Sequence, residues 1–588
     1  MLGRFHWRTI WIQFFWLNSL IFVRCSTSTI DSTQYNSHDA IVTRLLIELS
    51  STRQNLRDTK ELLKQAEQKI SNLTATPGVI PGQNAAVQKD KPNNKFSGHK
   101  LIHLDLGGAP PKLTYLLELL PYFRYWNATG LLIEYADTFP YDGELPVPLP
   151  GDFPNVHGTT PQAKLYALIQ RGKLYFDINH CTDFSKEEVS FLIKEALQNE
   201  LIVIPLVQTF GHLEFVLKHK QFAHLRETAK YTNSICPNHP ESAELVKKMI
   251  DQVAELHRGI KWFHVGADEV WNLKTCKTCL EDTNNKSMIF LKHMIPVLEH
   301  VRSRNLIPIM WDDMMREWTI DFLKVVGKLA QPMIWYYRTD LKRHFSKEMH
   351  QRYLEAFPRI WTASAFKGAT GPNNDFVSIS KHVSNNLQWV EIMNKMSERN
   401  EVLGIALTGW SRYDHYGTLC ELLPAAIPSL VFCLKAVNEH QMNEVLRNEI
   451  TTQLGFSNRI DVEGTEYYDY KEKYGDFPGH EIYELTLKLK DIHHALRLVH
   501  STEKGWMLRR QLLEKRLSYF RLRFARMKSI EAATAYADLR SEAETLLSQI
   551  YSNNTVQEWL SDKIDDRITD AQIQRRRIEN VQSIFYND

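Results

Sequence analysis

The strongest constraint on the fold is a repeat of eight short apolar runs, separated by helical patterns such as 186–198, 242–257 and 288–304. Continuous apolar strands suit a parallel sheet that is buried on both faces, and their alternation with helices predicts parallel connections. We therefore predict an α/β fold, a (β/α)8 TIM barrel, at residues 100–435. The eight predicted strands are 101–106, 130–135, 201–209, 262–267, 306–311, 332–337, 359–366 and 403–410.

Polar and aromatic side chains gather where these predicted strands end. The carboxyl ends of the strands carry the chemistry in parallel barrels. Sugars have polar edges and apolar faces, so carboxylates beside indole rings are typical of a carbohydrate pocket. A phosphorylated substrate would need a Gly-rich loop near the last strands, and 367–371 is only a weak match. The candidate site residues are Asp105, Glu134, His212, Asp268, Glu269, Trp311, Trp335, Tyr337, Trp361, Trp410, Arg412 and Asp414.

The segment 264–270 is the most informative of these strand ends. It leads from an apolar run through His264 and Gly266 into the adjacent carboxylates of Asp268 and Glu269. Adjacent carboxylates can divide acid–base work, because different environments can separate their pKa values. The segment also resembles the signature of family 20 glycoside hydrolases, the β-N-acetylhexosaminidases.

Longer blocks extend this resemblance to the hexosaminidase D-like branch of the family. It implies an exo-acting enzyme that removes terminal β-linked GlcNAc or GalNAc by substrate-assisted, retaining hydrolysis, with no metal and no organic cofactor. The sequence departs from the branch in two ways: segment 144–178 is longer, and a secretory signal precedes a fold usually described as nucleocytoplasmic. The matching blocks are 103–112, 131–135, 139–141, 204–215, 363–371 and 408–416.

The resemblance also implies roles for individual residues. Asp268 would hold the acetamido N–H, and Glu269 would be the general acid and then the general base. Tyr337, or alternatively Tyr336, would donate to the acetamido oxygen, and His212 would orient a catalytic carboxylate. The remaining candidates would wall the pocket or bind sugar hydroxyls: Trp311, Trp335, Trp361, Trp410, Arg412 and Asp414.

Three other interpretations compete with this one. The chain could be a non-catalytic glycan-binding TIM barrel on a membrane stalk, although a lectin needs no acid pair. The chemistry could instead lie at Asp312 and Asp313, as in other substrate-assisted glycosidases. The stalk itself could be the functional part.

The N-terminal residues predict a targeting signal followed by a stem. Arg4 and Arg8 flank an apolar run within residues 1–25, which is typical of a signal-anchor or a cleaved signal peptide. Apolar residues repeat every seven positions across 38–74, from Val42 to Ile70, and predict a coiled-coil stem and a homodimer; the alternative is one amphipathic helix docked on the barrel. Residues 75–99 form a predicted linker. This order is that of a type II Golgi membrane protein with a luminal catalytic domain, or of a secreted or lysosomal protein after cleavage.

The net charge and the cysteine spacing argue against two kinds of ligand, nucleic acid and zinc. Lys and Arg total 71 and Asp and Glu total 69, so the net charge of +2 argues against a nucleic-acid-binding surface. Cys276 and Cys279 form a lone CxxC with no second pair, which predicts a disulfide and no zinc site.

Residues 436–588 are helical, with apolar spacing at 481–499 and 506–520, and pack on the barrel or on a dimer partner. The sequence leaves open the preference for GlcNAc or GalNAc.

Overall fold

The computed structural model describes residues 96–586, apart from 144, 146–165, 170–171, 176–183, 458–459, 461 and 463–474. The predicted signal segment 1–25, the stem 38–74 and the linker up to residue 95 lie outside the described residues. So does most of segment 144–178, apart from the backbone of a hairpin formed by β3 (Tyr166–Ile169) and β4 (Gly172–Tyr175). No helix of the described residues is long and apolar enough to cross a membrane.

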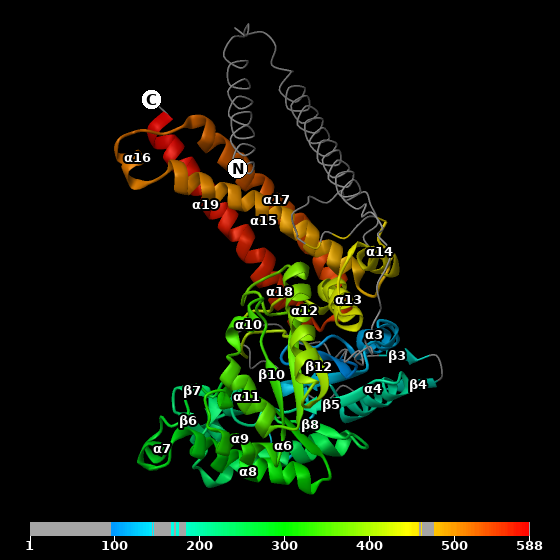
Figure 1. Ribbon diagram of the computed structural model, residues 1–588. Coiled ribbons are helices and arrows are strands. Elements are labelled where there is room, and N and C mark those ends of the chain that lie inside the picture. The colour runs from blue at the N-terminus through cyan, green and yellow to red at the C-terminus, as the bar shows by residue number, and fades with distance from the viewer. Residues whose placement is uncertain are drawn as a thin grey trace, which may run out of the picture. The chain divides into compact units, whose positions relative to one another are not determined.

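The predicted barrel is confirmed (Figure 1). Eight parallel strands close on themselves in the order β1-β12-β11-β10-β9-β8-β5-β2. Each strand lies within one of the predicted apolar runs or overlaps it by all but a few residues, although β1 begins one residue inside the predicted linker. The strands are β1 (His99–Asp105), β2 (Gly130–Glu134), β5 (Ile202–Leu206), β8 (Trp262–His264), β9 (Ile307–Trp311), β10 (Gln331–Trp335), β11 (Arg359–Lys367) and β12 (Glu401–Gly409).

Alternate side chains of these strands pack into two apolar layers. One cluster takes residues from all eight strands, Leu101 and Ala406 among them, and fills the barrel interior. The intervening residues, such as Ile102 and Ile405, pack outward in a second cluster with the helices. The period of two along each strand explains why the runs are apolar throughout.

The prediction that Trp361 walls the substrate pocket is wrong, because this residue belongs to the inner apolar layer of the barrel. Its side chain is fully buried, and its indole N–H donates to Gln331 Oε1 at 2.9 Å. It lies near the start of β11, about 20 Å along the strand from Lys367 at the carboxyl end. A tryptophan at that end of a strand fills the barrel and cannot contact a ligand at the opposite rim.

A helix follows each strand before the next strand of the barrel begins. The helix patterns predicted between the strands, at 186–198, 242–257 and 288–304, are confirmed as α4, α6 and α8. The barrel helices are α3 (Leu113–Tyr125), α4 (Lys186–Gln198), α6 (Pro240–Leu256), α8 (Lys286–Ser303), α9 (Ile320–Gly327), α11 (Lys347–Ala356), α12 (Ile379–Met396) and α13 (Leu423–Glu439).

Short insertions decorate the strand ends. Between β5 and α6 the chain forms α5 (Glu214–Leu217) and a hairpin of β6 (Arg226–Thr228) and β7 (Tyr231–Ile235). Between β8 and α8 it forms α7 (Lys277–Glu281), and α10 (Leu341–His344) follows β10. These insertions surround the carboxyl ends of the strands.

The C-terminal region is helical, as predicted. Its long helices α15, α17 and α19 run side by side (Figure 1). The buried positions of α17, from Leu522 to Ala543, recur at alternating intervals of three and four residues, which is the spacing of a helix-packing seam. The helices are α14 (Glu444–Gln453), α15 (His480–Trp506), α16 (Arg509–Leu513), α17 (Tyr519–Ile550), α18 (Asn553–Leu560) and α19 (Asp566–Tyr586).

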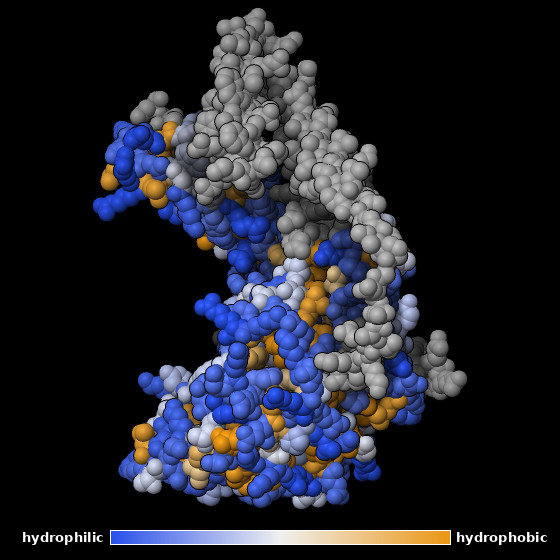
Figure 2. Space-filling view, in the orientation of Figure 1, coloured by the Kyte–Doolittle hydropathy of each residue, from blue (hydrophilic) through white to orange (hydrophobic). Residues whose placement is uncertain are grey.

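The apolar spacing at 506–520 predicted a helix there, and the structure shows that these residues do not form one continuous helix. The chain turns there through the short α16, and the exposed fractions of Leu508, Leu513 and Phe520 are 54%, 73% and 71%. Figure 2 shows orange, hydrophobic atoms at this end of an otherwise largely hydrophilic bundle surface. The apolar residues that suggested a helix therefore face solvent in the connection between α15 and α17.

The C-terminal helices pack on the barrel. Lys112 N donates to Ile550 O at 2.7 Å, and the Tyr115 hydroxyl donates to Pro478 O at 2.9 Å. A π-helical turn, η4 (Ser561–Asp565), carries Lys563, which pairs with Asp375 at 2.8 Å. These contacts involve loops that follow β1 and β11, so the C-terminal region lies against the rim that carries the candidate site.

Candidate active site

A cleft of about 580 Å³ opens at the carboxyl ends of the barrel strands. The lining includes every predicted site residue except Trp361. Predicted carboxylates come from β1, β2 and the loops after β8 and β12, and predicted aromatic rings come from β9, β10 and the loops after β10 and β12. The lining residues that sequence analysis did not select include Gln208, Glu214, Arg316, His344 and Tyr413.

Asp268 and Glu269 are held by a strained loop after β8. Gly266, Ala267 and Glu269 all have positive φ values, of 60°, 69° and 50°. A side chain at Gly266 would meet Gln208 Oε1 at 2.0 Å. Such conformations cost free energy outside glycine, and they persist where surrounding contacts fix the chain. The strain accompanies the placement of two consecutive carboxylates in one cleft.

The loop after β5 brings His212 to both carboxylates. His212 Nε2 lies 3.5 Å from Asp268 Oδ2 and 3.4 Å from Glu269 Oε2. Gly211 permits this approach, because a Cβ there would lie 2.1 Å from Asp268 O. Burial alone would disfavour the imidazolium, but the carboxylates of Asp268, Glu269 and Glu214 outweigh it and raise the pKa of His212 to about 10. A protonated His212 therefore links the pair.

Comparison with known proteins identifies this arrangement. Residues 163–414 match the glycosyl hydrolase family 20 catalytic domain. The chain is 36% identical to hexosaminidase D of Homo sapiens over 478 residues, which are 79% of this chain and 91% of that protein. The chain belongs to glycosyl hydrolase family 20. It is a β-N-acetylhexosaminidase of the hexosaminidase D-like branch.

A second relative and one solved structure are also similar to this chain. Hexosaminidase D of Bos taurus is 42% identical over 367 residues, covering 61% of this chain and 97% of that protein. Among solved structures, a β-N-acetylhexosaminidase from Bacteroides fragilis is 14% identical and has a TM-score of 0.43, covering 61% of this chain and 70% of that chain.

Burial sets the charge of two carboxyl groups in the family 20 cleft. It raises the pKa of Asp268 to about 6; His212 opposes this rise, whereas Glu134 adds to it. Burial also raises the pKa of Glu134 to about 7, although His212 and a 3.2 Å hydrogen bond from Gln208 Nε2 favour the carboxylate. Glu134 Oε2 lies 3.4 Å from His103 Nε2. Both carboxyl groups therefore take up a proton at a higher pH than a solvent-exposed carboxyl group would.

The tyrosines after β10 are distinguished by their contacts. The Tyr336 hydroxyl donates to Asp340 Oδ1 at 2.8 Å, and its ring stacks on His344. Tyr337 lies between aromatic rings instead, with ring centroids 5.1 Å from Trp335 and 6.5 Å from Trp410. Burial, with Asp268 and Glu269 nearby, raises the pKa of Tyr337 far above its usual value, so this hydroxyl stays protonated. Of the two tyrosines, Tyr337 therefore fits better the predicted role of a hydrogen-bond donor to the acetamido oxygen.

Asp312 and Asp313 lie behind the cleft lining, which argues against the paired-Asp interpretation. Asp312 is fully buried and accepts from Arg316 through both oxygens, each at 2.8 Å. Asp313 accepts the backbone N–H of Glu269 at 2.9 Å and the indole N–H of Trp335 at 3.0 Å. Asp313 is therefore a positioning residue for Glu269 and for the indole of Trp335, and no local pattern in the sequence indicates that role.

We expect Asp313→Ala to lower kcat by about 100-fold, because a shift of about 1 Å at Glu269 is enough for such a loss. Steady-state kinetics on an aryl β-GlcNAc, beside thermal unfolding, measures the effect, and Asp321→Ala on the exposed face of α9 is the matched control. An unchanged kcat in a folded Asp313→Ala protein would contradict the positioning role.

Arg412 lines the cleft but is already paired. Its guanidinium binds both oxygens of Glu558 on α18 and donates to Gly417 O at 2.7 Å. Arg412 therefore links the rim to the C-terminal helices, and its binding of sugar hydroxyls stays a prediction. Glu558 lies 146 residues away in sequence, so only the folded chain reveals this partner.

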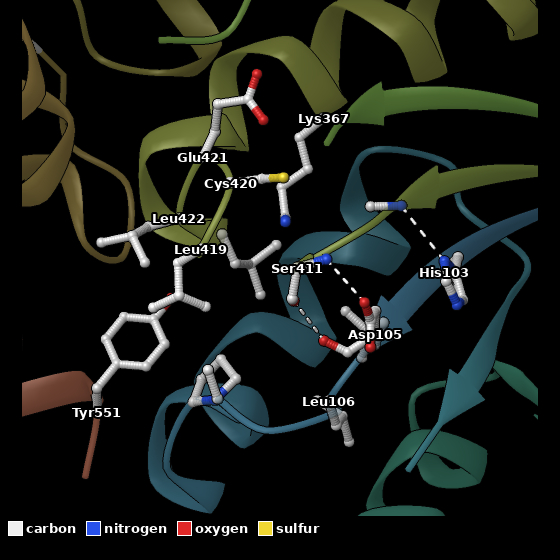
Figure 3. A pocket seen from close by; sticks show the side chains of 15 residues that line it. His103, Asp105, Leu106, Lys367, Ser411, Leu419, Cys420, Glu421, Leu422 and Tyr551 are labelled. Atoms are coloured by element: carbon white, nitrogen blue, oxygen red, sulfur yellow. Dashed lines mark hydrogen bonds between the residues drawn. The ribbon is translucent and has the colours of Figure 1, made fainter. Parts of the chain in front are cut away.

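A smaller cavity lies beside the cleft, behind Asp105 (Figure 3). Asp105 accepts backbone N–H groups from Ser411 at 2.8 Å and Gly107 at 3.0 Å, so its carboxylate fixes the loop after β12. On the far side of the cavity, Glu421 accepts from Gly368 N at 2.8 Å and from the Thr370 hydroxyl at 3.0 Å. A carboxylate therefore occupies the donors of the 367–371 loop, which excludes it as a phosphate site.

Proposed function

We propose that this enzyme removes terminal β-linked N-acetylglucosamine or N-acetylgalactosamine from glycoprotein glycans, with the substrate's own acetamido group as nucleophile. The observation that carries the proposal is the convergence of Asp268 and Glu269 on His212 within a cleft lined by indole rings. An acid beside a second, more buried carboxylate is what substrate assistance requires.

The proposed first step forms a cyclic intermediate. The acetamido oxygen attacks C1 of the sugar, the bond from C1 to the leaving oxygen breaks, and Glu269 gives its proton to that oxygen. Asp268 accepts the acetamido N–H and stabilises the positive charge of the oxazolinium ion. Tyr337 donates to the acetamido oxygen and aligns it for attack.

The second step releases the sugar. Glu269, now a carboxylate, takes a proton from water, and the water oxygen attacks C1 from the face that the leaving group vacated. The bond between C1 and the acetamido oxygen then breaks and restores the acetamido group. Two successive inversions at C1 give net retention.

The geometry favours hydrolysis over glycan binding alone. A lectin gains nothing from two carboxylates and an imidazole held together at the cost of three positive φ values, at His212, Ala267 and Glu269. Trp311, Trp335 and Trp410 would serve either function, because each can pack on a sugar face. The acid pair is the feature that distinguishes the two functions.

Because the proposed nucleophile is the acetamido group of the substrate, comparing sugars with and without that group tests the mechanism. We expect the full chain to hydrolyse aryl β-GlcNAc or aryl β-GalNAc at least about 1000-fold faster than aryl β-glucoside, which lacks the internal nucleophile. Initial rates on the three matched aryl glycosides measure this ratio. Equal rates would exclude substrate assistance, and glycan binding without any turnover would favour the lectin.

We further propose that the enzyme works in the secretory pathway as a type II Golgi membrane protein and homodimer. The support is the apolar segment in residues 1–25 and the heptad pattern at 38–74. Three Asn-x-Ser/Thr sites on the described surface, at Asn127, Asn285 and Asn553, are exposed and compatible with a lumen. Endoglycosidase treatment of the full chain from cells tests the location. A mobility shift that is lost when these three asparagines and Asn72, the fourth such site of the sequence, are all replaced by Gln supports it, and a cytosolic, unglycosylated protein contradicts it.

A further inference from the structure

Three thiols and a carboxylate converge outside the cleft. Cys236 follows β7, Glu227 lies on β6, and Cys276 and Cys279 lie at the start of α7. Cys236 Sγ is 3.6 Å from Cys276 Sγ and 3.7 Å from Cys279 Sγ, and Cys279 Sγ is 3.3 Å from Glu227 Oε2. All four ligand atoms lie within 4.8 Å of one another.

These separations match the edges of a coordination tetrahedron. Zinc–thiolate bonds of about 2.3 Å at tetrahedral angles place two sulfur atoms about 3.8 Å apart, and a zinc–carboxylate bond of about 2.0 Å gives an S–O edge of about 3.5 Å. The five cysteines within the described part of the chain are free thiols, so the predicted disulfide at Cys276 or Cys279 is wrong for this structure. A disulfide between two of these three cysteines would leave the third as an unpaired thiol.

The surroundings hold the four groups in place. Glu227 Oε1 accepts the backbone N–H of Thr275 at 2.6 Å and of Cys276 at 3.0 Å, which turns Oε2 toward the sulfurs. Cys279 Sγ accepts from Asn238 Nδ2 at 3.3 Å, and Cys276 Sγ accepts from Cys279 N at 3.3 Å. Hydrogen bonds of this kind orient the ligands of structural metal sites.

Burial strengthens the case for a cation. Glu227 is 1% exposed, Cys279 is fully buried, and Cys236 is 6% exposed. A carboxylate removed from water is costly unless a positive charge or a metal compensates it, and in the described part of the chain no lysine, arginine or histidine forms an ion pair with Glu227. Lys292, which contacts Asn238 beside the cluster, donates to Asn238 and to Asp282.

We propose that Cys236, Cys276, Cys279 and Glu227 bind a structural zinc ion. Four protein ligands close the coordination sphere, and soft sulfur donors in a tetrahedron select zinc over magnesium or calcium. Coordination also keeps the thiols from pairing with one another in an oxidising compartment. The sequence prediction of no metal rested on the absence of a second CxxC; the two further ligands come from a hairpin about 40 residues upstream.

The site joins two loops of the catalytic cleft. The β6–β7 hairpin contacts the His212 segment, since Leu213 N donates to Asn233 O and Ile235 N donates to Phe210 O. Asn272, on the loop that carries Asp268 and Glu269, donates to Asn233 Oδ1 at 2.7 Å. Zinc would therefore tie the hairpin beside His212 to the loop of the acid pair, as a positioning element and not as a reactant.

Metal analysis of the purified full chain tests the proposal. We expect about one zinc per chain in the wild type and in Cys433→Ser, a buried thiol on α13 outside the cluster, and close to none in Cys236→Ser. Zinc-free wild-type protein after purification with zinc present, or equal zinc in Cys236→Ser, would overturn the site. So would an intact mass that shows a disulfide among these cysteines.

A second measurement covers the case in which Cys236→Ser does not fold. Cobalt added to metal-depleted wild-type protein should give the absorption of a tetrahedral thiolate complex, and zinc should displace it. Chelation should also lower the thermal unfolding midpoint, and zinc should restore it. A cobalt spectrum without thiolate charge-transfer bands, or an unfolding midpoint that ignores chelation, would contradict the proposal whatever the catalytic activity.

Discussion

Glu269→Gln is expected to lower kcat on an aryl β-GlcNAc with a poor leaving group by about 1000-fold while substrate binding persists. General acid–base catalysis contributes about 10² to 10⁴ to a rate, and the amide keeps the shape of the side chain but cannot deliver a proton. Glu269 has the exposure that this role needs, because 32% of its side chain is accessible from the cleft side of the His212 contact. Steady-state kinetics and equilibrium binding of GlcNAc measure the two effects separately.

The leaving group sharpens this experiment. A nitrophenolate needs little protonation, so the first step on nitrophenyl β-GlcNAc should suffer much less than on a glycoside of a simple alcohol. Glu299→Gln, on the exposed face of α8, is the matched control and should behave as the wild type. A loss that does not depend on the leaving group would move the acid role away from Glu269.

Asp268→Asn is expected to lower kcat/KM for acetamido sugars by about 100- to 1000-fold. Asn fits the same space but removes the negative charge that would stabilise the oxazolinium ion, and removing one preorganised electrostatic partner costs about this much. The substitution also removes one of the carboxylates that keep His212 protonated. Kinetics on aryl β-GlcNAc and on aryl β-glucoside measure the loss, which should be far larger on the acetamido sugar.

The pH dependence provides an independent check on Asp268. Because burial raises the pKa of Asp268 to about 6, its carboxylate is present above that pH and is lost as pH falls through it. The wild-type kcat/KM should therefore decline on the acid side near pH 6, and this limb should weaken in Asp268→Asn. Asp321→Asn should keep the wild-type profile. Identical acid limbs in Asp268→Asn and the wild type would assign that titration to another group.

Much of the barrel was predictable because burial on both faces leaves a local mark. A strand covered by side chains within and helices outside must be apolar at every position, and eight such runs are visible in the sequence. The acid pair was visible for a related reason. Asp268 and Glu269 are adjacent in the chain and follow a strand, so they share one rim in any parallel barrel.

Trp361, the partner of Arg412 and residues 506–520 show what local patterns do not reveal. A tryptophan in a strand looks the same at either end of the barrel, and only the register placed Trp361 in the inner layer. Arg412 follows β12 as a sugar-binding residue might, but Glu558 neutralises it. Apolar spacing at 506–520 suggested a helix, yet packing placed a turn there between α15 and α17.

Local sequence patterns specify the strand–helix alternation, the apolar layers and the strand-end position of Asp268 and Glu269, because each depends on neighbours in the chain. Long-range packing brings His212 to both carboxylates, Asp313 to Glu269, and Glu227 and Cys236 to the CxxC. Those contacts join segments about 40 to 60 residues apart, and their geometry follows from how the whole barrel packs. No local periodicity records it.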